Sequence, residues 1–249
     1  MLTRLEIQLK VDGINKIPNQ KAVLLQSILL GKASQSFAEK MHISGLHPYS
    51  QAVGYENGRN IWKIHTLNDE SYNELIVPME NADFYQFEIT HNDWNVVIVS
   101  KQKIQISESE MMEQFYFSKG CRYIYIKFCT PTSFKTNGSY VIYPRVDLLY
   151  KSIFMKYEAA SKNETLYSDE LLEQMINSTQ ISSYRLQSCM YHIGKVPIPA
   201  FLGEITLRIG GPQSLVNFIH FLLQYGEFCG VGVKAGMGMG NIVIGGRER

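Results

Sequence analysis

The first part of the chain alternates apolar and polar residues and then changes to a helical spacing. The alternating residues are Leu5, Ile7, Leu9 and Val11. Alternation of this kind predicts a strand with one buried face. From Pro18 to Met41 the apolar residues are spaced three and four apart, which predicts a helical stretch. The small residues around Gly31 indicate a break or a close contact within it.

The rest of the first half predicts four further strands and two short helices. The strands are expected at Gln51–Tyr55, Ile61–Leu67, Phe84–Thr90 and Trp94–Ile106. The turn signal Glu56-Asn57-Gly58 separates the first two. One helix is expected at Glu70–Ile76, capped by Asp69, and the other at Glu108–Phe115.

The second half has a more regular pattern of strands and amphipathic segments. Its strands are expected at Arg122–Cys129, Tyr184–Ile193, Glu204–Ile209 and Asn241–Ile244. Its helices are expected at Pro144–Ala160, Glu170–Asn177 and Pro212–Tyr225. Pro197-Ile198-Pro199 is expected to lie in the connection between two strands.

The order of these elements predicts an α+β fold of two tandem ferredoxin-like domains. Each half fits a βαββαβ unit, in which helices cover one face of an antiparallel sheet and bury one core. We expect the domains to span residues 1–117 and 118–249.

Charge differs between the two halves although the whole chain is nearly neutral. The net charge is +1. Residues 1–117 carry 10 basic and 14 acidic residues, and residues 118–249 carry 14 and 9. The second half, at +5 against −4, is therefore the better candidate to face phosphate groups.

Other classes of protein receive little support from the sequence. No apolar run reaches the roughly 18 residues of a membrane span, and Met1 leads directly into a strand pattern. The cysteines Cys121, Cys129, Cys189 and Cys229 form no C-x-x-C pair, so we expect no metal and no disulfide framework. We expect a cytoplasmic protein that uses no cofactor and does not bind a membrane.

A glycine-rich segment lies between the last helix and the last strand. It reads Gly230-Val231-Gly232-Val233-Lys234-Ala235-Gly236-Met237-Gly238-Met239-Gly240. Backbone N–H groups of such a loop can bind phosphate, and Lys234 can pair with one. The segment lacks the spacing of a nucleotide-binding P-loop, and it follows a helix rather than a strand. A packing loop, in which the glycines serve turn geometry alone, is the alternative.

Several motifs in order resemble the repeat-processing endoribonucleases of CRISPR systems, in particular members linked to type III-A systems. They are Thr130–Lys135, Gly138–Tyr140, Tyr143-Pro144, Pro199–Glu204, Tyr225–Gly230 and the glycine-rich segment. The resemblance covers nearly the whole chain and implies two tandem ferredoxin-like domains. It also implies that the partner is CRISPR repeat RNA, with the product passed to a type III effector complex.

The resemblance implies a catalytic histidine at the end of the first long helix. Ala38-Glu39-Lys40-Met41-His42 occupies that position, and His47 stands where some members have a lysine or a second histidine. Some members also use a tyrosine within the first helix. The corresponding stretch here, Gln26–Leu30, contains none, so the second proton-transfer group is left open.

Such an enzyme cuts RNA without a metal. The ribose 2′-OH attacks the adjacent phosphorus, and the reaction leaves a 2′,3′-cyclic phosphate and a 5′-OH. Histidine suits both proton transfers because its unperturbed pKa is about 6.5. We expect His42, and less strongly His47, to be catalytic. Lys135, Lys234 and the glycines Gly230, Gly232, Gly236, Gly238 and Gly240 are expected to bind RNA.

Two alternatives remain at this point. The chain could be a noncatalytic RNA-binding subunit of a CRISPR effector complex, with the same fold and loop. It could also be an unrelated ferredoxin-like binding protein. The other histidines, His65, His91, His192 and His220, are placed on strands, a turn and an apolar helix, where a structural role is the simpler interpretation.

Overall fold

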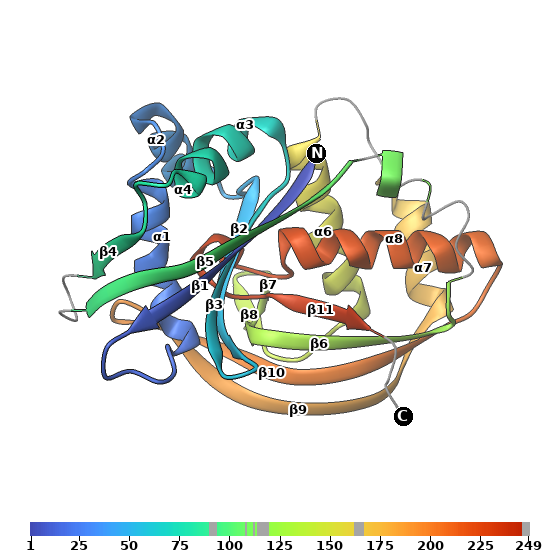
Figure 1. Ribbon diagram of the computed structural model, residues 1–249. Helices are drawn as coiled ribbons and strands as arrows, with labels where there is room; N and C mark the ends of the chain where they lie inside the picture. The colour runs from blue at the N-terminus through green and yellow to red at the C-terminus, as the bar shows by residue number, and fades with distance from the viewer. Residues whose placement is uncertain (90–93, 108, 112, 114–119, 162–166, 246–249) are drawn as a thin grey trace.

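The structure is a computed structural model in which two large antiparallel sheets are joined through a shared helical layer, with a small two-stranded sheet beside them (Figure 1). It describes residues 1–249 except 90–93, 108, 112, 114–119, 162–166 and 246–249. The strands are β1 Leu2–Val11, β2 Tyr49–Glu56, β3 Arg59–Thr66, β4 Gln86–Ile89, β5 Trp94–Ile106, β6 Tyr123–Thr132, β7 Phe134–Thr136, β8 Ser139–Val141, β9 Thr179–Ile193, β10 Val196–Ile209 and β11 Ile242–Gly245. The helices are α1 Ala22–Leu30, α2 Gln35–Ile43, α3 Asp69–Ser71, η2 Tyr72–Ile76, α4 Val77–Glu80, α6 Val146–Ala160, α7 Asp169–Ser178 and α8 Gln213–Cys229, with short 3₁₀ turns η1 Asn19–Lys21 and η4 Ala235–Met237.

The first sheet has the strand order β2-β3-β1-β5-β4. Without β4, this is the order of a ferredoxin-like unit, in which the first and third strands lie in the centre. β4 is an additional strand that pairs with β5 at one edge. Strand β5 begins and ends at the residues predicted from the sequence.

The second sheet has the order β11-β6-β10-β9, which is also that of a ferredoxin-like unit. The α+β class and the tandem ferredoxin-like organisation are thus confirmed. The boundary predicted near residue 117 falls within residues 114–119, outside the described part of the chain, and stays a prediction. The helix predicted at Glu108–Phe115 is helical at its described residues, 109–111 and 113. The turn predicted at His91 lies outside the described residues.

The first predicted helical stretch is divided in two, as its small residues indicated. α1 ends at Leu30, and α2 begins after Ser34, whose side chain accepts a hydrogen bond from the Phe37 N–H. A serine hydroxyl at this position satisfies one of the free N–H groups of the new helix. The break lets α2 take its own direction and carry His42 in its last turn.

The structure corrects two local predictions and adds one element. Asn68, rather than Asp69, caps α3, because its extended backbone lets its side chain accept from the Ser71 N–H at 3.0 Å. Pro197 and Pro199 lie inside β10 instead of in a connection. Among the described strands, this half of β10 pairs only with β9, because β6 joins at Phe201. Neither proline therefore removes a needed N–H. The β7–β8 hairpin was not predicted.

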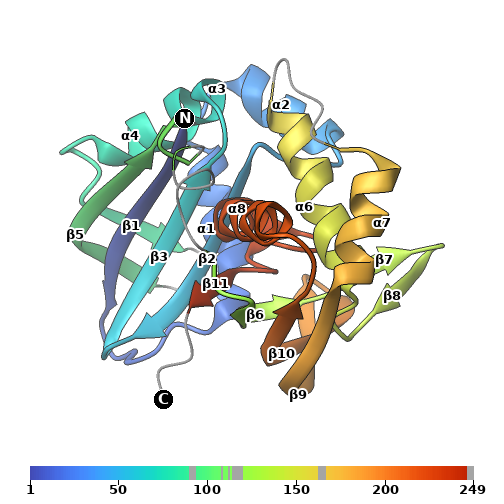
Figure 2. The ribbon, with the colours of Figure 1, turned by 90° about the vertical axis from the view of Figure 1, so that its right-hand side faces the viewer.

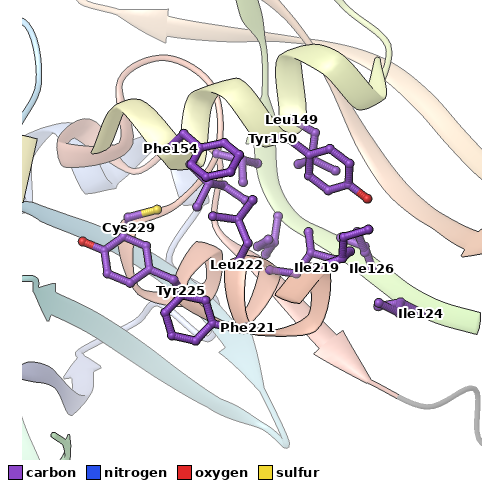
Figure 3. Close-up of a cluster of buried hydrophobic side chains, with 14 of the residues drawn as sticks. Ile124, Ile126, Leu149, Tyr150, Phe154, Ile219, Phe221, Leu222, Tyr225 and Cys229 are labelled. Carbon is purple, nitrogen blue, oxygen red and sulfur yellow. The ribbon is translucent and has the colours of Figure 1, made fainter. Parts of the chain in front are cut away.

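A core formed by β6, α6 and α8 stabilises the second unit (Figure 3). The labelled side chains that face one another there are Ile124, Ile126, Leu149, Tyr150, Phe154, Ile219, Phe221, Leu222, Tyr225 and Cys229. Figure 2 shows α8 end-on, with the first sheet on one side and α6 on the other. α8 also contacts β1, β2 and β3, so it joins the two units.

A buried histidine lies in the contact between α8 and the first sheet. Arg4 Nε donates to His65 Nε2 at 3.1 Å, and Ser50 Oγ lies 3.1 Å from His65 Nδ1. Ser50 in turn donates to the Phe228 carbonyl at 2.5 Å. This chain of bonds requires a neutral imidazole that carries its proton on Nδ1. Complete burial holds the pKa of His65 well below its usual value, with Arg4 and Lys63 adding to the effect.

Because the pKa of His65 is lower in the folded protein, the unfolded chain binds its proton first. The free energy of unfolding should therefore fall as the pH drops below about 6.5, by at most about 1.4 kcal/mol per pH unit for this one group. We expect His65→Gln to reduce this slope, since glutamine keeps an acceptor and a donor but does not titrate. Urea unfolding at pH 5.5 and 7.5 measures it. Identical slopes in the two proteins would contradict this role of His65.

Candidate active site

The glycine-rich segment folds back on itself, with the Val231 N–H donating to the Gly240 carbonyl, and its backbone has little conformational freedom. Gly232, with φ +70°, and Gly240, with φ +71°, lie so close to neighbouring backbone that an added Cβ would meet the Ser133 oxygen at 2.2 Å and the Val231 oxygen at 1.9 Å. Only glycine tolerates both conditions. These two glycines are therefore required for the close packing of the loop, whether or not the loop also binds RNA.

Four of the glycines use their N–H groups within the chain. The acceptors of Gly230, Gly232, Gly238 and Gly240 are, in that order, the Gly226 carbonyl, Ser152 Oγ, the Ala235 carbonyl and the Pro131 carbonyl. These amides are engaged, so an RNA-binding role for the glycines depends on the shape they give the loop. Lys234, at φ +59°, is placed by that shape.

A buried glutamine attaches the loop to the first unit. Gln51 Nε2 donates to the Gly236 carbonyl at 3.0 Å and to the Ala22 carbonyl at 2.6 Å. Its own oxygen accepts from Trp62 Nε1 at 2.6 Å. The loop, the first helix and the first sheet therefore meet at one fully satisfied polar group.

A cavity of about 880 Å³ opens between the loop, α2 and α6. Six of the nine sequence-predicted site residues line it: His42, His47, Lys135, Gly232, Lys234 and Gly236. The other three glycines of the loop do not line it and are packed against neighbouring residues instead: Gly230, Gly238 and Gly240. Residues nearly two hundred positions apart are thus brought together.

The charge of this cavity is of one sign. Its lining includes Lys135, Lys151, Lys156 and Lys234, and among the described residues that line it there is no aspartate or glutamate. An anion is the ligand that such a lining attracts. Arg145, a further basic candidate, instead pairs with Asp147 at 2.5 Å. Nowhere in the described part of the chain do three His, Cys, Asp or Glu side chains gather as a metal site would need.

The two candidate histidines have different surroundings. His42 is exposed in the last turn of α2. His47 is partly buried in the following loop, stacked on Tyr49 at a centroid distance of 5.3 Å and packed against Gly236. Burial lowers the pKa of His47, and Lys234 and Lys156 add to this effect, although hydrogen bonds to the backbone of Met41 and Ser44 oppose it.

The structure adds residues that the sequence patterns did not single out. Tyr49 lines the cavity, and its hydroxyl accepts a hydrogen bond from Gln26 Nε2 at 2.9 Å. Burial raises the pKa of Tyr49 to about 12, so it keeps its proton at neutral pH. Gln26 belongs to the helical stretch that lacks a tyrosine, and β2 supplies one opposite it. Tyr140 lies beneath Lys135, with Nζ 5.6 Å from the ring centroid.

Lys156 is also new. It lies on the buried face of α6 and is 6% exposed. Its ammonium donates to the Gly230 carbonyl at 3.0 Å. The sequence signal was present, because a lysine sits among the apolar residues Ile153, Tyr157 and Ala160 of an amphipathic helix.

These features define a class: two tandem ferredoxin-like units with a basic cavity where the glycine-rich loop meets the first unit. The family model described as CRISPR-associated endoribonuclease Cas6 matches residues 126–242. A protein of that description from Mycobacterium tuberculosis H37Rv is 30% identical over 250 residues, covering 98% of this chain and 78% of its own. One from Streptococcus thermophilus is 29% identical over 226 residues, 90% of each chain. The chain belongs to the Cas6 family of CRISPR-associated endoribonucleases.

Solved structures agree on the fold. Thermus thermophilus Cas6 has a TM-score of 0.71 and 22% identity, with 98% of both chains covered. A Cas6 product complex has a TM-score of 0.74 and 21% identity, with 98% of this chain and all of the other covered. In the described part of the chain, none of the helices is long and apolar enough to cross a membrane.

Proposed function

We propose that this protein cuts CRISPR precursor RNA within its repeats and that the basic cavity is where the cut occurs. The observation that carries the proposal is the convergence of His42, His47 and four lysines on a cavity whose described lining residues include no carboxylate. RNA phosphates supply the missing negative charge. The relatives are CRISPR-associated endoribonucleases, and similar solved structures include product and substrate-mimic complexes of Cas6 proteins.

The proposed reaction uses no metal. The 2′-OH attacks the adjacent phosphorus while a base removes its proton, and an acid protonates the departing 5′-oxygen. Electrons pass from the 2′-oxygen to phosphorus and on to the leaving oxygen, so the products are a 2′,3′-cyclic phosphate and a 5′-OH. Lysine ammonium groups stabilise the additional negative charge of the phosphorane.

His42 is the first candidate for proton transfer, because it is exposed at the cavity and needs no rearrangement to reach RNA. His47 is the second. Its lowered pKa keeps it neutral at pH 7, as a base must be. Lys135 on the β7–β8 hairpin and Lys234 on the glycine-rich loop are proposed to hold the RNA backbone on either side of the cavity.

The assay is incubation with repeat RNA in EDTA, followed by analysis of the product ends. We expect cleavage, a cyclic phosphate and a free 5′-OH. Tight binding without cleavage would favour the alternative, a noncatalytic RNA-binding subunit of an effector complex. Repeat RNA that neither binds nor is cut would contradict the proposal. Transfer of the product to a type III effector complex and a cytoplasmic location stay predictions.

If His47 is the base, the cleavage rate should depend on pH in the way that the protonation of His47 does. We expect the single-turnover rate to fall only when the pH drops below about 6.5, since a lowered pKa keeps the imidazole neutral until then. His47→Gln should remove this acidic limb and leave a slower rate. If the rate of His47→Gln falls over the same pH range as that of the wild-type protein, another residue is the base.

A further inference from the structure

Lys156 is a buried cation that has no charged partner among the described residues. It is 6% exposed, and none of the ion pairs in the described part of the chain includes it. Its bond to the Gly230 carbonyl uses one of its three N–H donors. The Cys229 thiol nearby does not supply a negative charge, because burial raises the pKa of that thiol to about 12.

Such a group is costly to keep. Removing an ammonium from water without an anionic partner is unfavourable, and strongly perturbed ionisable groups gather at functional sites. Burial lowers the pKa of Lys156, which is the expected sign of that cost. An anion in the cavity would remove the cost, since Lys156 is one of the residues that line it.

Lys156 also lies where it can control the glycine-rich loop. Ser152, one helical turn earlier on α6, accepts a hydrogen bond from the Gly232 N–H at 3.2 Å. Lys156 holds the Gly230 carbonyl two residues away. The same face of α6 therefore fixes the start of the loop that carries Lys234.

We propose that the Lys156 ammonium binds one phosphate group of the RNA at the buried end of the cavity, while its bond to Gly230 keeps the loop against that phosphate. This inference rests on the proposed function, since it takes RNA as the ligand. It adds a buried residue of α6 to the exposed lysines that line the cavity, Lys135, Lys151 and Lys234.

The test is a charge-deletion cycle. The probe is a set of repeat RNAs, each with one phosphate replaced by a neutral methylphosphonate. The nucleotide before each methylphosphonate is 2′-deoxy, so that the modified linkage cannot be cut. In the wild-type protein at least one position should weaken binding about tenfold or more, as expected for a hydrogen bond to a charged group. In Lys156→Met the same methylphosphonate should have no further effect. Lys195→Met, an exposed lysine between β9 and β10, is the control and should retain the full effect.

Stability separates this role from a structural one. If Lys156 serves RNA binding, Lys156→Met should melt at the same or a higher temperature without RNA, because methionine removes an unpaired buried charge. A lower melting temperature, with every methylphosphonate effect retained, would overturn the proposal. So would unchanged RNA binding.

Lys156→Gln keeps an N–H donor without the charge and provides the comparison if the methionine variant does not fold. It should lose the same methylphosphonate effect; wild-type binding in this variant would also overturn the inference. The outcomes are independent of cleavage. If the proposed function is wrong, the wild-type protein does not cut repeat RNA. If this inference is wrong, the methylphosphonate still weakens RNA binding in the Lys156 variants.

Discussion

Replacing His42 with alanine should slow cleavage of repeat RNA by about 10²- to 10⁴-fold, the usual contribution of a positioned acid or base. RNA affinity should stay nearly unchanged, because the cavity's lysines and the loop remain. Since His42 is exposed, the free energy of unfolding should change by no more than about 0.5 kcal/mol. Single-turnover cleavage and filter binding on the same RNA measure the two effects.

His192→Ala is the matched control for this experiment. His192 is another exposed histidine, on β9, and it does not line the cavity. Its loss should leave the rate unchanged. Cleavage by His42→Ala at the wild-type rate would refute the assignment of the active site, although not the membership of the family.

Replacing Gly232 with alanine should abolish tight RNA binding and lower stability. The new Cβ would lie 2.2 Å from the Ser133 carbonyl oxygen, a backbone atom that cannot move alone, and φ +70° adds about 1–2 kcal/mol of strain. The loop must shift, and Lys234 shifts with it. Thermal unfolding and binding of uncleavable repeat RNA measure the two effects.

Gly138→Ala separates the clash from the strain. Gly138 has φ +78° in the turn of the β7–β8 hairpin, but an added Cβ there meets nothing within 4 Å. It should lose only the modest energy of a strained residue and still bind RNA. Equal losses of binding in the two variants would contradict the special role of the packed loop.

The sequence predicted the elements of both sheets well, because each strand alternates or is continuously apolar and each long helix has an apolar face. It failed where tertiary contacts decide. Pro197 and Pro199 are typical of a connection. They can lie in a strand because no second strand pairs with this part of β10 in the described part of the chain. The β7–β8 hairpin is too short for a periodic pattern.

The site was predictable only in part, and for a related reason. His42, His47, Lys135 and Lys234 could be proposed from motifs, since motifs are local. Tyr49 becomes a candidate only when the fold brings β2 to the loop. Lys156 is visible in the sequence as a lysine on the apolar face of a helix, but only the fold places it beside the loop. Likewise, the sequence suggested free N–H groups on the glycines, whereas Gly232 and Gly240 donate to Ser152 and Pro131.

The most direct measurement is a structure with repeat RNA that carries a 2′-deoxy nucleotide at the cut. We expect the scissile phosphate in the cavity, with His42 within hydrogen-bond reach of the 2′ position or the 5′-oxygen, and Lys234 and Lys156 on phosphate oxygens. A scissile phosphate beside Tyr123 and Arg208, an exposed pair of facing residues on β6 and β10 outside the cavity, would contradict the proposal.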